Sequence, residues 1–144
     1  MNLAAVLALA VTWAAHDGDT LYTGRSCRSS DTCIRLAAVD CPEIGQPYGR
    51  EARDLARQLL VSGAAYTARG RERSHGRIVA TMRLRDGRDL GMALISAGAC
   101  WAEPRYRPPV EYVLAQQHAR AAKLGLWRAD APVAPWEWRK RGRK

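Results

Sequence analysis

The spacing of apolar residues changes period near residue 50, and this change constrains the fold more than any other feature of the chain. Before it, short apolar runs alternate with turn signals rich in Gly, Asp and Ser, which is typical of β-strands joined by tight turns. In residues 51–60, apolar side chains recur at i, i+3, i+4, i+7 and i+8, which predicts an amphipathic helix. The chain therefore places strands first and at least one helix after them.

The same patterns predict five strands and three helices in all. The strands are expected at residues 11–15, 21–23, 34–39, 65–68 and 78–84, and the helices at residues 51–60, at 90–97 and between Pro109 and Gly125. With 144 residues, the chain has room for one domain around one core. A small β-barrel with packed helices fits this order. A five-stranded OB-type barrel with about three helices is the leading candidate, because it suits the length.

The net charge of +9, from 23 basic and 14 acidic residues, favours an anionic partner. Nucleic acid is the first candidate and a membrane surface the second, but the predicted helices lack the broad apolar face with basic flanks of a membrane-bound helix. Five of the basic residues fall in residues 139–144. We expect this stretch to be a solvated tail that adds non-specific electrostatic affinity and takes no part in a catalytic site.

Residues 1–10 are largely apolar and allow two interpretations. They resemble the apolar region of a secretory signal, with a small-residue cleavage site at residues 8–10, and this would make the protein secreted or periplasmic. No Lys or Arg precedes the apolar stretch, so the alternative is a lead-in to the first strand of a cytoplasmic protein. The folded domain is accordingly expected at residues 11–138.

Four cysteines allow three disulfide pairings. Cys27 and Cys33 flank a polar turn between two strand-like runs, and a hairpin would bring them within bridging distance. Closing so short a loop would stabilise the fold by about 2 kcal/mol. A disulfide suits an exported protein. Zinc ligation is the alternative, although the chain has no Cys-x-x-Cys pair of the kind that zinc sites use.

Two aspartates, Asp19 and Asp40, each fall at the end of a predicted strand beside a turn or a proline. Carboxylates from two separate strands would converge on one divalent cation, and ligation by oxygen alone suits Ca²⁺ or Mg²⁺. The backbone carbonyl of Cys41 would supply a further ligand. The alternative is that residues 17–19 form an ordinary turn.

Two arginines are candidates for binding a phosphate, because a guanidinium group contacts phosphate oxygens in pairs. Arg35 lies in an otherwise apolar strand, so it should face a cleft or pair with Asp40 or Glu43. A straight strand spans about 16 Å over five residues and puts Arg35 and Asp40 on opposite faces, so one shared site requires a strongly coiled strand. Arg77 follows a basic, Gly-marked turn that would present its side chain or simply be solvated. His75, in that turn, is a weaker candidate as a proton donor.

Several blocks of the chain resemble the staphylococcal nuclease-like thermonucleases. The matching residues are 17–20, 34–36, 39–43, 48–52, 76–77, 125–127 and 135–139. Each block is weak alone, but they occur in the order of that family across nearly the whole chain. The resemblance implies an OB-fold barrel and the Ca²⁺-dependent hydrolysis of DNA and RNA. It also implies cleavage of the 5′ P–O bond, which leaves 3′-phosphates.

The resemblance further implies a role for each candidate residue. The implied roles are ligation of one Ca²⁺ ion by Asp19, Asp40 and the backbone carbonyl of Cys41, general-base catalysis by Glu43, and phosphate binding by the catalytic arginines Arg35 and Arg77. His75 stands where the family has a nucleotide-contacting tyrosine, and Tyr106 is the aromatic residue that we expect to touch substrate. The expected protein is a monomer that binds DNA and RNA and no membrane. The competing function is a non-catalytic OB-fold module that binds nucleic acid.

Overall fold

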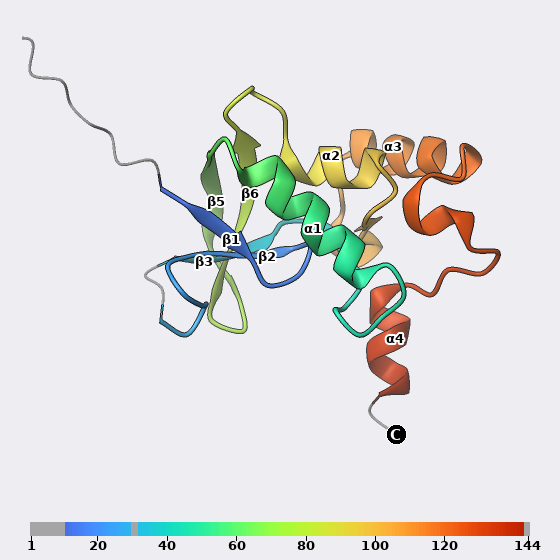
Figure 1. Cartoon of the computed structure of the whole chain (residues 1–144), viewed down its shortest axis with the longest axis horizontal. Coiled ribbons are helices and arrows are strands. Elements are labelled where there is room, and N and C mark those ends of the chain that lie inside the picture. The colour runs from blue at the N-terminus through green and yellow to red at the C-terminus, as the bar shows by residue number, and fades with distance from the viewer. Residues whose placement is uncertain (1–10, 30–31, 143–144) are drawn as a thin grey trace, which may run out of the picture.

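The computed structural model describes residues 11–142 except residues 30 and 31. Residues 1–10, where a signal segment or a lead-in is expected, lie outside the described residues. The strands are β1 (Trp13–Ala15), β2 (Thr20–Thr23), β3 (Cys33–Leu36), β4 (Val39–Asp40), β5 (Ala64–Ser74), β6 (Arg77–Leu84) and β7 (Trp101–Ala102). The helices are α1 (Gly49–Leu60), α2 (Leu90–Ser96), α3 (Val110–Ala121) and α4 (Pro135–Arg141), with short 3-10 turns at Pro104–Tyr106 and Gly125–Arg128. The elements form an α+β fold in which the helices gather on one side of the strands (Figure 1).

Five strands form one sheet in the order β1-β2-β3-β6-β5. β3 and β6 run parallel, and the other neighbours run antiparallel. The predicted α+β architecture and five-stranded sheet are confirmed, but closure into a barrel is not. Within the described residues, the edge strands β1 and β5 are not paired with each other. Trp13 of β1 instead reaches the other edge with its side chain, and its indole Nε1 donates a hydrogen bond of 2.9 Å to the carbonyl of Ala64. A side chain, rather than a backbone ladder, therefore connects the two edges.

The prediction of a single strand at residues 34–39 is wrong. The segment divides into β3 and β4, because residues 37 and 38 form a turn in which Ala38 has the left-handed angle φ +59°. β4 leaves the large sheet and pairs antiparallel with β7, so that Asp40 lies opposite Trp101. The turn also removes the expected conflict between Arg35 and Asp40, because the two side chains do not alternate along one straight strand.

The hydrophobic core lies between the large sheet and helices α1, α2 and α3. Helix α1 buries Ala52, Ala56 and Leu60, as its apolar spacing predicts. Asp89 caps α2 by accepting a hydrogen bond from a backbone N–H of its first turn, and it also accepts one of 2.7 Å from the phenol of Tyr112 on α3. This shared acceptor fixes α3 against α2. No helix among the described residues is long and apolar enough to cross a membrane.

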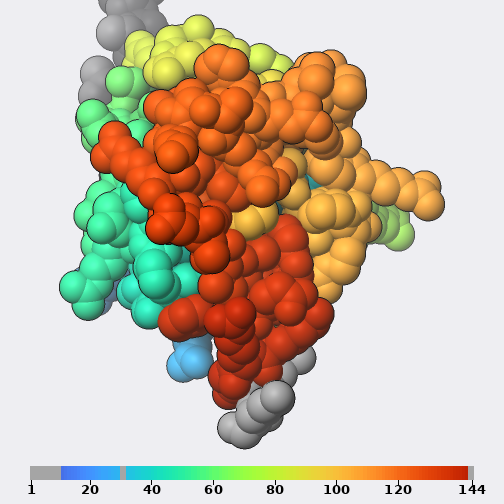
Figure 2. All heavy atoms as spheres, turned by 90° about the vertical axis from the view of Figure 1, so that its right-hand side faces the viewer, coloured from blue at the N-terminus to red at the C-terminus, as the bar shows by residue number. Residues whose placement is uncertain are grey.

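Residues 139–141, the first part of the tail that the sequence predicts, are helical. They are the last turn of α4, which lies below α3 on one face of the molecule (Figure 2). The helix begins at Pro135, a position that suits proline, and that residue is buried. Trp136 packs edge-on against Trp101, with ring centroids 5.5 Å apart. Helix α4 therefore continues past residue 138, where the domain was expected to end.

All four cysteines are in disulfides, one joining Cys27 to Cys33 and the other joining Cys41 to Cys100. The first closes the hairpin between β2 and β3, which is the pairing considered from the sequence. The second joins the residue after β4 to the residue before β7, and the sequence spacing does not indicate it. The zinc alternative is wrong because no cysteine in the chain is left as a thiol ligand.

Candidate active site

Asp19 is positioned by a tight turn between β1 and β2. The side chain of Asp17 accepts hydrogen bonds from the backbone N–H groups of Asp19 (3.1 Å) and Thr20 (2.7 Å), which is an Asx-type turn. The backbone carbonyl of Asp19 accepts a hydrogen bond of 2.9 Å from the N–H of Leu36 in β3. The Asp19 side chain is therefore held in a buried position at the start of β2. The turn that was the alternative to a functional site is present, and it serves to orient this carboxylate.

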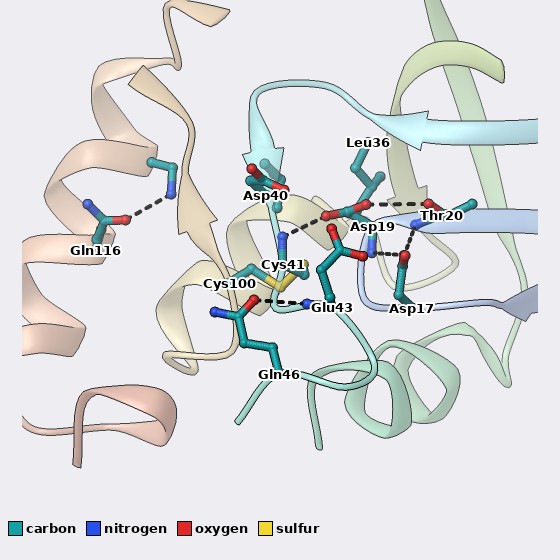
Figure 3. The surroundings of a disulfide bond; sticks show 12 residues. Asp17, Asp19, Thr20, Leu36, Asp40, Cys41, Glu43, Gln46, Cys100 and Gln116 are labelled. Atoms are coloured by element: carbon teal, nitrogen blue, oxygen red, sulfur yellow. Dashed lines mark hydrogen bonds between the residues drawn. A yellow bond between two sulfur atoms is a disulfide. The ribbon is translucent and has the colours of Figure 1, made fainter. Parts of the chain in front are cut away.

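Cys41 brings the second acidic segment to the first. Its backbone N–H donates a hydrogen bond of 2.6 Å to Asp19 Oδ2. Its sulfur is bonded to Cys100, and a Cβ added at Gly18 would lie 2.7 Å from the Cys41 side chain. Figure 3 shows the carboxylates of Asp19, Asp40 and Glu43 gathered beside this disulfide. The structure thus brings together the three carboxylates that the sequence singles out.

Arg35 lies between the two buried aspartates. Its Nη1 is 3.3 Å from Asp19 Oδ1, and its Nη2 is 3.3 Å from Asp40 Oδ1. Nη1 also donates to the backbone carbonyls of Leu36 and Val39 on either side of the turn. The side chain is 13% exposed, so its charge needs these partners. Pairing with Asp40, one of the two alternatives from the sequence, is therefore present, and the guanidinium still borders a cavity described below.

Arg77 is placed by the hairpin between β5 and β6. His75 and Gly76 form the turn, with φ of +49° and +81°, the left-handed angles that a tight hairpin requires. In the sheet register, Arg35 lies opposite both Thr20 and Val79, so Arg77, two residues before Val79, lies on the same face.

The Arg77 side chain joins the acidic cluster through Thr20. Arg77 Nη1 donates 2.8 Å to the Thr20 hydroxyl, which is 3.4 Å from Asp19 Oδ1. Arg77 is also tied to the carbonyl and hydroxyl of Ser74. The two phosphate-binding candidates therefore belong to one hydrogen-bonded network that passes through Asp19.

Arg139 is a member of the site that the sequence prediction missed. Its Nη1 and Nη2 bind both oxygens of Asp40, at 3.1 and 2.7 Å, and Nη1 also binds Glu43 Oε1 at 2.8 Å. The residue was assigned to a solvated tail because it belongs to a run of basic residues. Pro135, which favours the start of a helix, and the neighbouring tryptophans were the signals that could have indicated a packed helix instead.

Glu103 is a second missed residue, and it lies directly after β7. Its side chain is 1% exposed and accepts hydrogen bonds from Arg105 Nε (3.0 Å) and Nη2 (2.9 Å). Burial raises the pKa of Glu103, but the hydrogen bonds and the positive charge of Arg105 outweigh it, so the pKa lies below its usual value. The residue reaches the site through the pairing of β4 with β7, which no local pattern indicates.

The buried aspartates hold their protons more tightly than free carboxylic acids do. Removal from water raises the pKa of Asp19 to about 6, although the charge of Arg35 opposes the shift. Burial, together with the negative charge of Asp19, raises the pKa of Asp40 to about 6, although hydrogen bonds from Arg139 oppose the shift. An additional positive charge between the two would stabilise their ionised forms.

The donor set fits a hard cation in kind, because it consists of carboxylate and carbonyl oxygens. Within the described residues, no three His, Cys, Asp or Glu side chains are grouped so that they could hold a metal ion by themselves. Backbone carbonyl and water oxygens would therefore have to complete the coordination of an ion at Asp19 and Asp40. Both Asp40 oxygens already accept from Arg139, and an ion would use their remaining lone pairs.

A cavity of about 260 Å³ adjoins this network. Arg35, His75 and Tyr106 are among the residues that line it, together with Arg69 and Arg73 from β5. Tyr106 is exposed, so its ring is accessible from solvent. The two weaker substrate-binding candidates therefore lie around the same hollow as Arg35, which has both cationic and aromatic walls.

Comparison with known proteins assigns the chain to a family. The family described as "Staphylococcal nuclease homologue" matches residues 33–129. An uncharacterized endonuclease of Escherichia coli is 36% identical over 125 residues, covering 87% of this chain and 80% of that protein. An uncharacterized endonuclease of Haemophilus influenzae is 28% identical over 124 residues, covering 86% and 68%. The staphylococcal-like nuclease CAN1 of Arabidopsis thaliana is 31% identical over 110 residues, covering 76% of this chain but 34% of that protein. The chain belongs to the staphylococcal nuclease family.

Proposed function

We propose that the protein is a Ca²⁺-dependent phosphodiesterase that hydrolyses DNA and RNA and leaves 3′-phosphates. The observation that supports this most directly is the network that joins Arg77, Asp19, Arg35 and Asp40 beside a cationic cavity. Relatives of the chain are named nucleases or endonucleases, which supports the same activity. The net charge of +9 suits a polyanionic substrate.

In the proposed mechanism, Asp19, Asp40 and the backbone carbonyl of Cys41 would hold the ion. When bound, Ca²⁺ supplies positive charge that polarises a phosphate oxygen of the substrate. Glu43 orients a water molecule for in-line attack on phosphorus or takes its proton. The bond from phosphorus to the 5′ oxygen then breaks, and the products are a 3′-phosphate and a 5′-hydroxyl.

The two arginines would stabilise the charge that builds on the phosphate oxygens during the attack. Arg35 borders the cavity. Arg77 lies on the same face of the sheet as Arg35, because it precedes Val79, the residue paired with Arg35, by two positions. His75 and Tyr106, on the cavity wall, would contact the sugar or base of the nucleotide. The substrate would therefore span the space between β5, β6 and the turn after β7.

We also propose that the domain is an OB-type barrel that works as a monomer outside the cytoplasm. The five-stranded sheet and the hydrogen bond from Trp13 to Ala64 across its two edges support the barrel. The two disulfides support export, because such bonds persist in oxidising compartments.

The activity can be tested with plasmid DNA and with RNA, each incubated with the protein in Ca²⁺ or in EGTA. We expect fragments in the Ca²⁺ tube and none in the EGTA tube. If the fragments end in 3′-phosphates, a polymerase should extend them only after a phosphatase has removed those phosphates. A Glu43→Gln variant should lose activity, and full activity in this variant would remove Glu43 from the mechanism. Intact substrate in both tubes would refute the proposal.

A non-catalytic nucleic-acid-binding module is the second candidate. The observation in its favour is that Asp40 is paired with two arginines, Arg35 and Arg139, which balance its charge. Such a module would retain DNA in a filter-binding assay equally well in Ca²⁺ and in EGTA, and it would leave the plasmid intact. The same two tubes therefore separate the two candidates.

A further inference from the structure

Arg139 contacts the candidate site more extensively than a surface arginine would. Its Nη1 bridges two carboxylates, at 3.1 Å from Asp40 Oδ1 and 2.8 Å from Glu43 Oε1. Its Nη2 binds the second oxygen of Asp40 at 2.7 Å. The guanidinium thus fixes the separation between a buried carboxylate and the half-exposed carboxylate of Glu43.

The position of Arg139 is set by the packed start of α4. Pro135 is fully buried, and Trp136 packs against Trp101. Arg139 follows these two residues by four and three positions, so all three lie on the same side of the helix. Trp101 is paired with Asp40 across the β4–β7 ladder, which ties the helix anchor to the acidic residue itself.

Glu43 depends on this C-terminal segment at two points. Its backbone N–H donates 3.1 Å to the side chain of Gln46, which donates in turn 2.6 Å to the carbonyl of Val133, just before α4. Its carboxylate accepts a hydrogen bond of 2.8 Å from Arg139. Gln46 therefore positions the backbone of Glu43, and Arg139 orients its carboxylate.

We propose that Arg139 is a positioning residue for hydrolysis: it holds the Glu43 carboxylate in its working orientation relative to Asp40. This inference rests on the proposed function of Glu43, and it adds to the site a residue from the C-terminal helix α4. Arg139 acts through Glu43 and is not itself required to touch the phosphate. Residues that orient a reactive side chain in this way typically contribute about ten- to hundredfold to activity.

A positioning role of Arg139 predicts a pair of changes, in Ca²⁺ affinity and in kcat, that a misfolded variant would not show. Removing the Arg139 charge from beside Asp40 removes a repulsion toward a cation, so Ca²⁺ affinity should rise by about tenfold. Removing the contact to Glu43 should lower kcat at the same time, with KM little changed because Arg35 and Arg77 remain. Tighter cation binding together with slower turnover is therefore the expected result.

The experiment compares the full-length wild type with Arg139→Ala, Arg139→Lys and the control Arg141→Ala. Arg141 is an exposed arginine in the same last turn of α4, so its loss removes the same charge without touching the carboxylates. Ca²⁺ affinity is measured by calorimetry without nucleic acid, and kcat and KM are measured on a DNA oligonucleotide at saturating Ca²⁺. We expect Arg139→Ala to lose about ten- to hundredfold in kcat and to bind Ca²⁺ more tightly, whereas Arg141→Ala changes neither.

Arg139→Lys keeps the charge but loses the two-nitrogen fork, so it should keep the wild-type Ca²⁺ affinity and have a reduced kcat. If Arg139→Ala fails to fold, the kcat of Arg139→Lys tests the positioning role by itself. Unchanged or increased kcat in either variant would overturn the inference, as would an equal loss in Arg141→Ala. A wild type that cleaves no substrate would instead refute the proposed function, and the positioning role would fall with it.

Discussion

Breaking the Cys41–Cys100 disulfide should cost more stability than breaking the Cys27–Cys33 disulfide. The bonded residues are 59 positions apart in the first pair and 6 in the second. In the chain-entropy relation, the stabilisation grows with the logarithm of the number of residues in the closed loop. This gives about 4 kcal/mol for the long loop and about 2 kcal/mol for the short one. The two bonds thus provide an internal comparison in one protein.

Packing adds to the difference between the two bonds. Cys41 and Cys100 are 3% and 0% exposed, whereas Cys27 and Cys33 are partly exposed in the hairpin. Replacing the buried pair with alanine removes two sulfur atoms from the core and leaves a small void, at a cost of about 1 kcal/mol. We therefore expect the buried double substitution to lower the free energy of unfolding by about 5 kcal/mol.

The assay is urea unfolding followed by tryptophan fluorescence, on wild type, Cys27→Ala/Cys33→Ala and Cys41→Ala/Cys100→Ala. The urea slope is fitted separately for each protein, because breaking a disulfide lets the unfolded chain expand and can raise the slope. Equal losses in the two double variants, or a larger loss in the hairpin pair, would refute the reasoning.

Three further perturbations test the site directly. Arg35→Ala should lower kcat about a hundredfold, because it removes a charge-stabilising donor; single-turnover cleavage of a DNA oligonucleotide measures this. Asp19 and Asp40 have pKa values of about 6 in the folded protein, above their unfolded values, so the folded state binds more protons and stability should fall as pH rises from about 4 to about 6. Urea unfolding across that range should show a smaller decrease for Asp19→Asn than for wild type. Gly18→Ala should lower stability by about 1 to 3 kcal/mol, because its Cβ would lie 2.7 Å from the Cys41 side chain; Gly45→Ala, with open space around it, is the control in thermal melts.

Local patterns predicted most elements of the fold because each pattern reports on its own neighbourhood. The apolar spacing located α1, and the strand-like runs located β1, β2, β3 and β6 to within three residues, whereas β5 extends six residues beyond its predicted end at residue 68. The division at Ala38 was missed because alanine does not favour the left-handed angle that the turn requires. The two-residue strand β7 has too few residues to show any period.

The candidate residues could be singled out from the sequence by residue type, but most of their contacts could not be predicted. Asp19, Asp40 and Arg35 were recognised by residue type beside turns or within an apolar strand. The ionic partner of Glu43 was not recognised, because Arg139 lies 96 residues away and in a basic run that usually indicates a solvated tail. Charge composition alone does not distinguish a mobile arm from a helix docked by two tryptophans.

The site is built almost entirely from contacts between distant parts of the chain, which links its geometry to global folding. Asp19 is bound by the N–H of Cys41, 22 residues on, and Thr20 is bound by Arg77, 57 residues on. Cys41 carries both the N–H that holds Asp19 and the sulfur that reaches Cys100. A break in that disulfide should therefore release the Asp19 contact before the core melts, because the anchor and the donor are the same residue. Activity should then fall at lower urea concentrations than fluorescence does in the Cys41→Ala/Cys100→Ala protein, whereas the two transitions should coincide in wild type.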